Sequence, residues 1–173
     1  PGTTRDAIDT PLRFKARVLN FIDTAGMRKR GKIDEAVEFY AFLRTARAVE
    51  RADVCVIVVD AAEGLTAMDI KIAGQAWEAG TGLVIAVNKW DLVEKDHTTA
   101  DAGHKQSLER APFLEAVPFL YLSAKTGLRA QRALDAVVEV AAARQRRNQT
   151  AEVNRAIKEL VAERPPPQAG GAE

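Results

Sequence analysis

Residues 54–60 read VCVIVVD, an uninterrupted apolar run that ends in one aspartate. β-Branched residues dominate the run, and its length is that of a strand rather than of a helix. An apolar strand without polar alternation is typical of a parallel sheet whose two faces are both covered. We therefore predict a β-strand over residues 54–60 that is buried on both faces.

The segments around this run alternate between strand and helix patterns. Two strand-like runs, residues 7–14 and 18–23, are joined by a short polar connection that suits a hairpin, and Pro11 places the first run at a sheet edge because it has no N–H to donate. The other predicted elements are helices within 34–50, over 66–79, near 103–116 and over 128–146, and strands over 83–88 and 118–122. Strands separated by such helices imply right-handed crossovers, so we predict an α/β fold with a doubly wound, mainly parallel sheet and flanking helices.

The composition fits one domain and by itself names no partner. The chain has 173 residues, 47% of them hydrophobic, and 25 Lys and Arg stand against 24 Asp and Glu. This balance gives no strong field toward nucleic acid or a membrane surface. The single cysteine, Cys55, excludes a disulfide framework and suits a small buried side chain in a reducing compartment. No apolar stretch approaches the roughly 18 residues of a membrane span, so we expect a cytoplasmic protein with neither a membrane nor DNA as partner.

The two ends of the chain differ from its middle. The first residues, PGTTRD, have no methionine or lead-in, which we interpret as a cut edge. After a basic stretch at residues 144–147, residues 150–163 form one more helical pattern. Residues 165–173 are rich in Pro, Gly and Ala, a composition typical of a linker or a disordered tail. We therefore predict two units, residues 1–148 and residues 149–173.

The string Asp23-Thr24-Ala25-Gly26 follows the second predicted strand. In an open parallel sheet the ligand lies beyond the carboxyl ends of the strands, so residues directly after a strand are candidates for binding. The Asp23 carboxylate can reach a Mg²⁺ directly or through water, and Gly26 lets a backbone N–H approach a terminal phosphate. Taken alone, the string fits a strand-terminal turn capped by aspartate equally well.

A second string, Asn88-Lys89-Trp90-Asp91, follows the strand over residues 83–88. Guanine presents its N1–H and its 2-amino group as adjacent donors, and one carboxylate, Asp91, can accept both; adenine offers no such pair. Asn88 can contact N7 and brace neighbouring loops, while the stem of Lys89 can lie over the base. A solvated loop with a satisfied aspartate is the alternative, and for this string alone the two stay about equal.

A third string, Ser123-Ala124-Lys125, follows the last predicted strand. The small Ala124 allows its backbone N–H to meet the guanine O6, and Ser123 can brace Asp91. A helix-capping serine and a turn are the alternative for this piece. Because all three strings lie at strand ends of one predicted sheet, their joint occurrence favours guanine-nucleotide binding.

These strings, in this order, resemble the third, fourth and fifth guanine-binding motifs of translation-factor-class GTPases. Further stretches resemble the second GTPase domain of the Der (EngA) family, whose members have two tandem GTPase domains followed by a KH-like domain. The stretches that carry this resemblance are GTTRD at residues 2–6, GKI at 31–33, RADV at 51–54, DAAEG at 60–64 and NRAI at 154–157. The resemblance implies a GTPase domain over residues 1–148 and the start of a KH-like domain, with a disordered tail, over 149–173.

The resemblance also implies ligands and roles for individual residues. Thr4 and Asp23 would contact Mg²⁺, and Thr3 would lie in a loop around a potassium ion. Gly26 would donate its N–H to the γ-phosphate. By the same resemblance, the nucleotide-binding residues are those of the three strings together with Met27. Met27 stands where many small GTPases carry a glutamine that orients the attacking water. Relatives with an apolar residue here rely on a monovalent cation or on groups supplied from elsewhere, and the resemblance suggests potassium. No catalytic residue is assigned.

The sequence has no G-x-x-x-x-G-K-[ST] string, the loop that cradles the phosphates of a nucleotide. In the related P-loop NTPase-type GTPase domain, the segment with this loop also holds the first, central strand, so we expect a gap in the sheet. The resemblance implies GTP and GDP as ligands, GTP hydrolysis, and a role in assembling the large ribosomal subunit with its rRNA and proteins. The chain by itself is expected to be inactive. A non-catalytic α/β module that binds rRNA or the ribosome stays open as the alternative.

Overall fold

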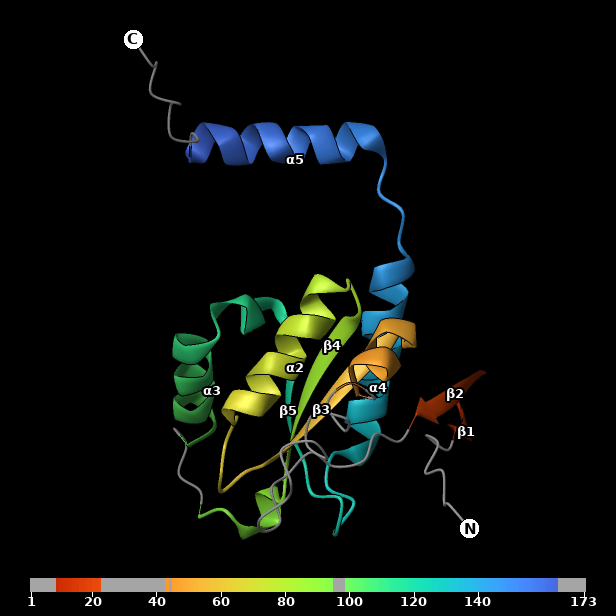
Figure 1. Ribbon diagram of the computed structural model, residues 1–173, viewed down its shortest axis with the longest axis vertical. Helices are drawn as coiled ribbons and strands as arrows, with labels where there is room; N and C mark the ends of the chain where they lie inside the picture. Colours follow the sequence, from red (N-terminus) through yellow and green to blue (C-terminus); the bar gives the residue numbers. More distant parts are fainter. Residues whose placement is uncertain (1–8, 23–42, 44, 95–98, 165–173) are drawn as a thin grey trace.

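The structure is a computed structural model, and it describes residues 9–22, 43, 45–94 and 99–164. Figure 1 shows how the elements are arranged. They are β1 (Asp9–Phe14), β2 (Arg17–Ile22), β3 (Val54–Asp60), α2 (Ala67–Glu78), β4 (Gly82–Asn88), η1 (Trp90–Leu92), α3 (Thr99–Arg110), η2 (Pro112–Ala116), β5 (Phe119–Tyr121), α4 (Ala130–Gln145) and α5 (Thr150–Glu163). Residues 45–51, which precede β3, are also helical.

A parallel sheet of three strands, in the order β3-β4-β5, forms the centre of the fold. The β3–β4 register runs from Val54 opposite Gly82 to Asp60 opposite Asn88, and β5 pairs with the middle of β4. Each crossover contains a helix, as the α/β prediction requires. Because the strands are parallel, the residues that follow them meet at one edge of the sheet.

Helices α2 and α4 cover opposite faces of this sheet (Figure 1). Ile57 and Ile85 point toward α2 and belong to a buried core that also contains Ala73, Ala76 and Leu114. Gly82 alternates along β4 with the residues that face α2, so it lies on the opposite face of the sheet. A Cβ added to Gly82 would lie 2.6 Å from Cγ1 of Val140 in α4. The sheet is therefore sandwiched between helices, with its larger core on the α2 side.

The predicted hairpin of β1 and β2 forms, but the described residues leave it outside the main sheet. Phe14 pairs with Arg17, so the connection has two residues, and Lys15 adopts the positive φ of 53° that tight hairpin turns favour. Pro11 lies in a strand that pairs only with β2, which confirms its position at an edge within the described part. Two separate sheets are what the expected gap predicts.

One prediction about β3 is wrong. Its Val56 and Val58 are exposed, Val58 by 58%, whereas Ile57 and Val59 between them are buried. The exposed pair points to the face covered by α4, and α4 packs mainly over β4 rather than β3. Among the described residues no strand pairs with the outer edge of β3, so this side of the strand is covered incompletely.

The polar helix predicted near residues 103–116 has different bounds. Helix α3 covers Thr99–Arg110, and a separate 3₁₀ helix, η2, covers Pro112–Ala116. Pro112 cannot donate a backbone hydrogen bond and restricts the residue before it, so the α-helix ends ahead of it. Ala111, the N-cap of η2, has extended rather than helical φ. The other helices and strands lie within a few residues of their predicted ranges wherever the structure describes them.

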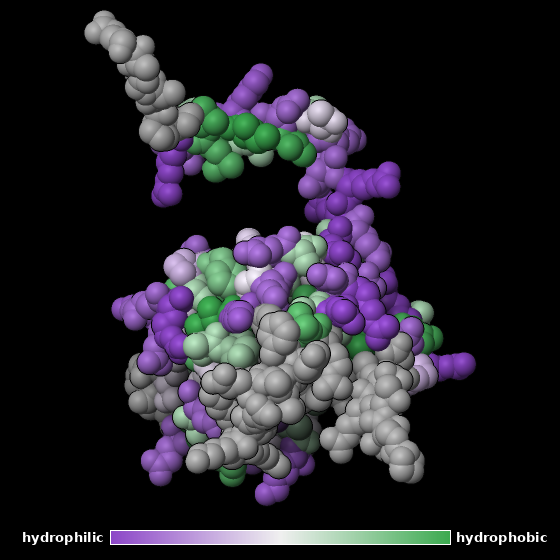
Figure 2. Space-filling view, in the orientation of Figure 1, coloured by the Kyte–Doolittle hydropathy of each residue, from purple (hydrophilic) through white to green (hydrophobic). Residues whose placement is uncertain are grey.

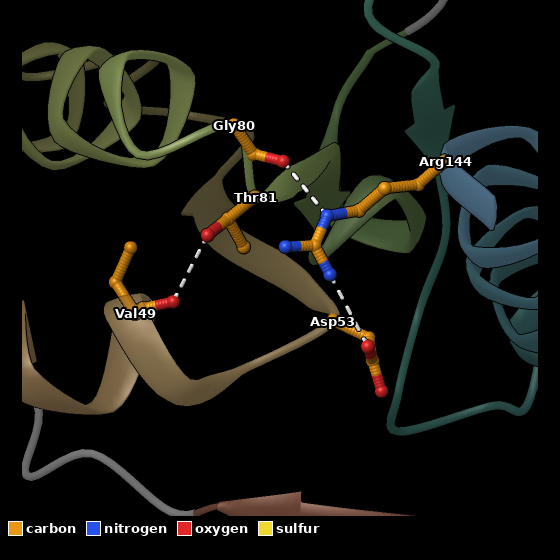
Figure 3. Close-up of polar contacts among 5 residues, drawn as sticks. All are labelled: Val49, Asp53, Gly80, Thr81 and Arg144. Carbon is orange, nitrogen blue, oxygen red and sulfur yellow. Dashed lines mark hydrogen bonds and ion pairs between the residues drawn. The ribbon is translucent and has the colours of Figure 1, made fainter.

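A polar cluster ties three elements together at the amino edge of the sheet (Figure 3). The Thr81 hydroxyl donates to the carbonyl oxygen of Val49 at 3.0 Å. Arg144 of α4 donates from Nε to the Gly80 carbonyl at 2.8 Å and pairs through Nη1 with the Asp53 carboxylate at 3.2 Å. These contacts fix the helix of residues 45–51, the turn before β4 and α4 at the edge opposite to the predicted binding residues.

Helix α5 stands apart from the sheet and its helices (Figure 1). Every residue from Thr150 to Glu163 is exposed. Its apolar residues gather along one side, visible as a green stripe in Figure 2; they are Val153, Ile157, Leu160 and Val161. Within the part of the chain that the structure describes, α5 included, no helix has the length and apolar character that crossing a membrane requires.

Candidate functional site

The loop after β4 holds the residues expected to read a guanine base. Asn88 ends β4, and η1 begins at Trp90, so Lys89 alone makes the turn between them. Lys89 adopts a left-handed backbone with φ 61° and ψ 28°, which is uncommon for a residue with a side chain. The carbonyl oxygen of Lys89 accepts from the N–H of Leu92 at 3.0 Å, which closes the turn. This geometry sets Asp91 just beyond the carboxyl end of β4.

Trp90 anchors this loop in the protein. Its side chain is only 8% exposed, and its ring lies 4.5 Å from that of Tyr121 in β5. The Trp90 N–H donates to the Leu122 carbonyl at 3.1 Å, and the Tyr121 hydroxyl donates to the Ala100 carbonyl at 2.8 Å. Burial, and then the negative charge of Asp101, raise the pKa of Tyr121, because both disfavour the phenolate. Sequence reasoning placed Trp90 in the binding set; the structure shows it as the loop's hydrophobic anchor.

The loop after β5 carries the third string. Ser123 is fully buried, its N–H donates to the Leu128 carbonyl at 3.1 Å, and its Oγ accepts from the Thr126 N–H at 3.2 Å. Ala124 and Lys125 are exposed beside it. Ser123 therefore holds the loop in place from within. The contact that was expected between Ser123 and Asp91 stays a prediction.

A hydrogen bond joins these two loops. The Ala124 N–H donates to Oδ1 of Asn88 at 2.9 Å, across a separation of 36 residues in the chain. The bracing role predicted for the Asn88 amide is thus seen, with Ala124 as its partner. The same N–H was expected to meet the guanine O6, so a bound base would share this donor with Asn88 or displace it.

A third loop, after β3, reaches the same edge through Asp60. Its carboxylate lies 2.5 Å from Nζ of Lys89 and accepts from the Ala62 N–H at 3.0 Å. The Ala61 N–H donates to the Asn88 carbonyl at 2.9 Å, which joins the loop after β3 to the end of β4 through their backbones. Sequence reasoning missed Asp60 as a member of this site, although its position at the end of the buried strand was the signal that could have found it.

The remaining predicted residues lie outside the described part of the chain. They are Thr3, Thr4, Asp23, Thr24, Ala25, Gly26 and Met27. In residues 9–22, 43, 45–94 and 99–164, no group of three or more His, Cys, Asp or Glu side chains is placed to hold a metal ion. The Asp60 carboxylate is engaged by Lys89 and Ala62, so it is not set up as a ligand either. The Mg²⁺ and K⁺ assignments therefore rest on the undescribed residues.

Loops at the carboxyl ends of three parallel strands, joined to one another by side-chain and backbone hydrogen bonds, form the edge at which open α/β domains bind their ligands. The comparisons with known proteins agree. The chain belongs to the family described as the Elongation factor Tu GTP binding domain, which matches residues 1–143.

Curated relatives are similar to the chain over nearly its whole length. A GTPase Der of Gemmatimonas aurantiaca is 51% identical over 99% of the chain, and a GTPase Der of Caldicellulosiruptor saccharolyticus is 47% identical over all of it. The chain spans 40% and 39% of these two proteins. The resemblance to the Der family is thereby confirmed.

Solved structures share the fold at low sequence identity. Era in complex with MgGDPNP and part of 16S ribosomal RNA matches with a TM-score of 0.64 and 19% identity, over 80% of this chain and 45% of that one. The translation elongation factor SelB of Methanococcus maripaludis, in complex with a GTP analogue, matches with a TM-score of 0.63 and 16% identity, over 79% and 28%. These matches confirm the predicted fold of a P-loop NTPase-type GTPase domain.

Proposed function

We propose that this chain is the guanine-nucleotide-binding part of a GTPase that acts in ribosome assembly. The observation that carries the proposal is the hydrogen bond from the Ala124 N–H to Asn88, which joins the two loops expected to surround a guanine base. Asp91 lies on the first of these loops, half-buried, in the turn that Trp90 anchors. A carboxylate there can accept from both N1–H and the 2-amino group of guanine, and adenine would leave it without donors.

Hydrolysis requires groups from elsewhere in the chain and from its cofactors. We propose Thr4 and Asp23 as the residues that hold Mg²⁺, a hard cation that prefers oxygen ligands, and Thr3 as a residue of a potassium site. Gly26 would approach the γ-phosphate through its N–H. Met27 cannot orient water, so we propose that a potassium ion supplies charge stabilisation in its place. The chain without a phosphate-binding loop is expected to hydrolyse GTP negligibly, and measurable turnover would contradict this.

The ribosomal role follows from the relatives rather than from the site. The similar proteins are named GTPase Der, and the Der family resemblance implies work on the large subunit. Era, which shares the fold, was solved with 16S ribosomal RNA. We therefore propose the large ribosomal subunit as partner and the cytoplasm as location, and residues 149–173 as the start of a KH-like domain.

The experiment is a titration of a fluorescent GDP analogue against two proteins, this chain and the chain extended at its N-terminus to include a phosphate-binding loop. We expect only the extended protein to bind, and we expect unlabelled GTP, but not ATP, to displace the label. Asp91→Asn should lower the preference for guanine over adenine by at least about a hundredfold, because the amide cannot accept from both donors. Glu94→Gln, an exposed change one turn further on, is the matched control and should leave the preference unchanged.

Two outcomes would contradict the proposal. If neither protein binds the analogue, the guanine assignment of Asn88 and Asp91 is wrong. If the chain binds ribosomal RNA with an affinity that Asp91→Asn leaves unchanged, while no nucleotide binds, a non-catalytic RNA-binding module is the better description.

A further inference from the structure

Asp60 is a buried carboxylate at the binding edge that none of the guanine motifs includes. It is the last residue of β3, it is 8% exposed, and it lies beside Asn88 in the register of the sheet. A buried charge is costly unless it is paired and hydrogen-bonded. The contacts of Asp60 therefore indicate what this charge does at the edge.

Both oxygens of the Asp60 carboxylate are engaged. Oδ2 lies 2.5 Å from Nζ of Lys89, and Oδ1 accepts from the N–H of Ala62 at 3.0 Å. The backbone carbonyl of Asp60 accepts from the N–H groups of Glu63 and Gly64, at 3.1 and 2.9 Å. The turn after β3 thus holds the carboxylate rigidly, and the carboxylate in turn holds the end of the Lys89 side chain.

The Lys89 side chain would be free to move without this ion pair. Its backbone is fixed in the left-handed conformation, while its side chain is 54% exposed and has four rotatable bonds. Ordering a lysine side chain costs conformational entropy. A side chain that is already ordered before the ligand arrives spares the complex that cost. The ion pair with Asp60 holds the Lys89 stem toward β3, so its position beside the base is fixed before the nucleotide binds.

We propose that Asp60 is a positioning residue for guanine-nucleotide binding, which acts through its ion pair with Lys89. This inference rests on the proposed function, because it assumes that Lys89 lies against a bound base. In this arrangement Asp60 acts on the nucleotide through Lys89. It sets the direction of the Lys89 stem. The nucleotide therefore dissociates more slowly from this protein than from one in which the Lys89 side chain is free to move.

The test uses the extended protein with its phosphate-binding loop and measures the dissociation rate of the fluorescent GDP analogue. Asp60→Asn keeps an oxygen that can accept from Ala62 and removes the charge that pairs with Lys89. Lys89→Met keeps the apolar stem and removes the ammonium group. Asp53→Asn is the matched control, because Asp53 also forms an ion pair, with Arg144, at the opposite edge of the sheet.

We expect Asp60→Asn to raise the dissociation rate about tenfold, Lys89→Met to raise it by a similar factor, and the double variant to be no faster than either. The control should dissociate at the wild-type rate. Non-additivity is the readout that a structural role for Asp60 would not produce, because a weakened turn after β3 would add to the loss of Lys89. If Asp60→Asn does not fold, Asp60→Ser gives a hydroxyl acceptor for the same comparison.

The results separate this inference from the proposed function. If the wild-type protein binds no guanine nucleotide, the proposed function fails and the inference fails with it. If the wild-type protein binds, but Asp60→Asn dissociates at the wild-type rate or its effect adds to that of Lys89→Met, the positioning role is overturned and the proposed function stands.

Discussion

Cys55 shows how burial in β3 changes the chemistry of one residue. Burial raises the pKa of its thiol to about 11, since the thiolate would lose its solvation beside the core. In the unfolded chain the pKa is that of an exposed thiol, about 8.5. Between these values the unfolded chain releases a proton that the folded chain retains, so the free energy of unfolding falls as pH rises through this window.

We therefore predict that the wild-type protein loses up to roughly 1.4 kcal/mol of stability per pH unit relative to Cys55→Ala between about pH 8.5 and 11. Urea unfolding of both proteins at pH 7.5, 9 and 10.5 measures this difference. Below pH 8 the difference between the two should be constant. A difference that is constant over the whole range would contradict the raised pKa.

Site residues were predictable from the sequence where they follow a single strand, but contacts between residues that follow different strands were not. Asn88 and Asp91 follow from the run over residues 83–88 and from the donors of guanine. The ion pair of Asp60 and Lys89 did not follow, because 29 positions separate the two residues and only the parallel register of β3 and β4 brings them together. The bracing role of Asn88 was predicted, but its partner, the Ala124 N–H, was not, because the two lie 36 positions apart on loops after different strands.

Helix α4 meets strand β4 so closely at Gly82 that a methyl group has no room. An added Cβ would lie 2.6 Å from Cγ1 of Val140, 3.1 Å from the Asp53 carbonyl oxygen and 3.2 Å from Cγ2 of Val54. Val140 is β-branched and lies on a packed helix, so it cannot turn away easily. The backbone atom of Asp53 cannot turn away either.

We predict that Gly82→Ala lowers the free energy of unfolding by about 1–3 kcal/mol. Gly74→Ala, in the middle of α2, meets nothing within 4 Å and should raise stability by up to about 1 kcal/mol through its helix propensity. Thermal or urea unfolding measures both variants, and the same Gly→Ala change should lower the free energy of unfolding at residue 82 and raise it at residue 74. Partial recovery of Gly82→Ala by Val140→Ala would identify α4 as the obstacle, and equal stability of Gly82→Ala and wild type would contradict it.

Element types were predictable from periodicity, while element boundaries and coverage depended on the whole fold. The run over residues 54–60 identifies a strand, but its sequence cannot show that α4 lies mainly over β4 and leaves Val56 and Val58 exposed. The end of α3 was misplaced although Pro112 signals it, because the residues after Pro112 continue as a 3₁₀ helix with similar composition.

At the scale of the whole molecule, α5 contributes little to the domain that precedes it. All of its residues are exposed, and Figure 1 shows it separate from the sheet. We predict that a chain ending at Asn148 unfolds with a free energy within about 0.5 kcal/mol of the full chain. A chain ending at Arg129, which lacks α4 with its buried Ala136, should not fold cooperatively. Calorimetry on the three chains measures this, and a large loss at Asn148 would mean that α5 packs on the domain.

The outer edge of β3 has a consequence for how copies of the protein behave toward one another. Along this edge, the described residues leave backbone N–H and C=O groups without a strand partner, beside the exposed Val56 and Val58. Such an edge is a template onto which the same edge of a second molecule can add. Self-association of this kind is second order in protein, so doubling the concentration would quadruple its initial rate. Dilution during refolding would thus lower the rate of this association more steeply than it lowers the protein concentration.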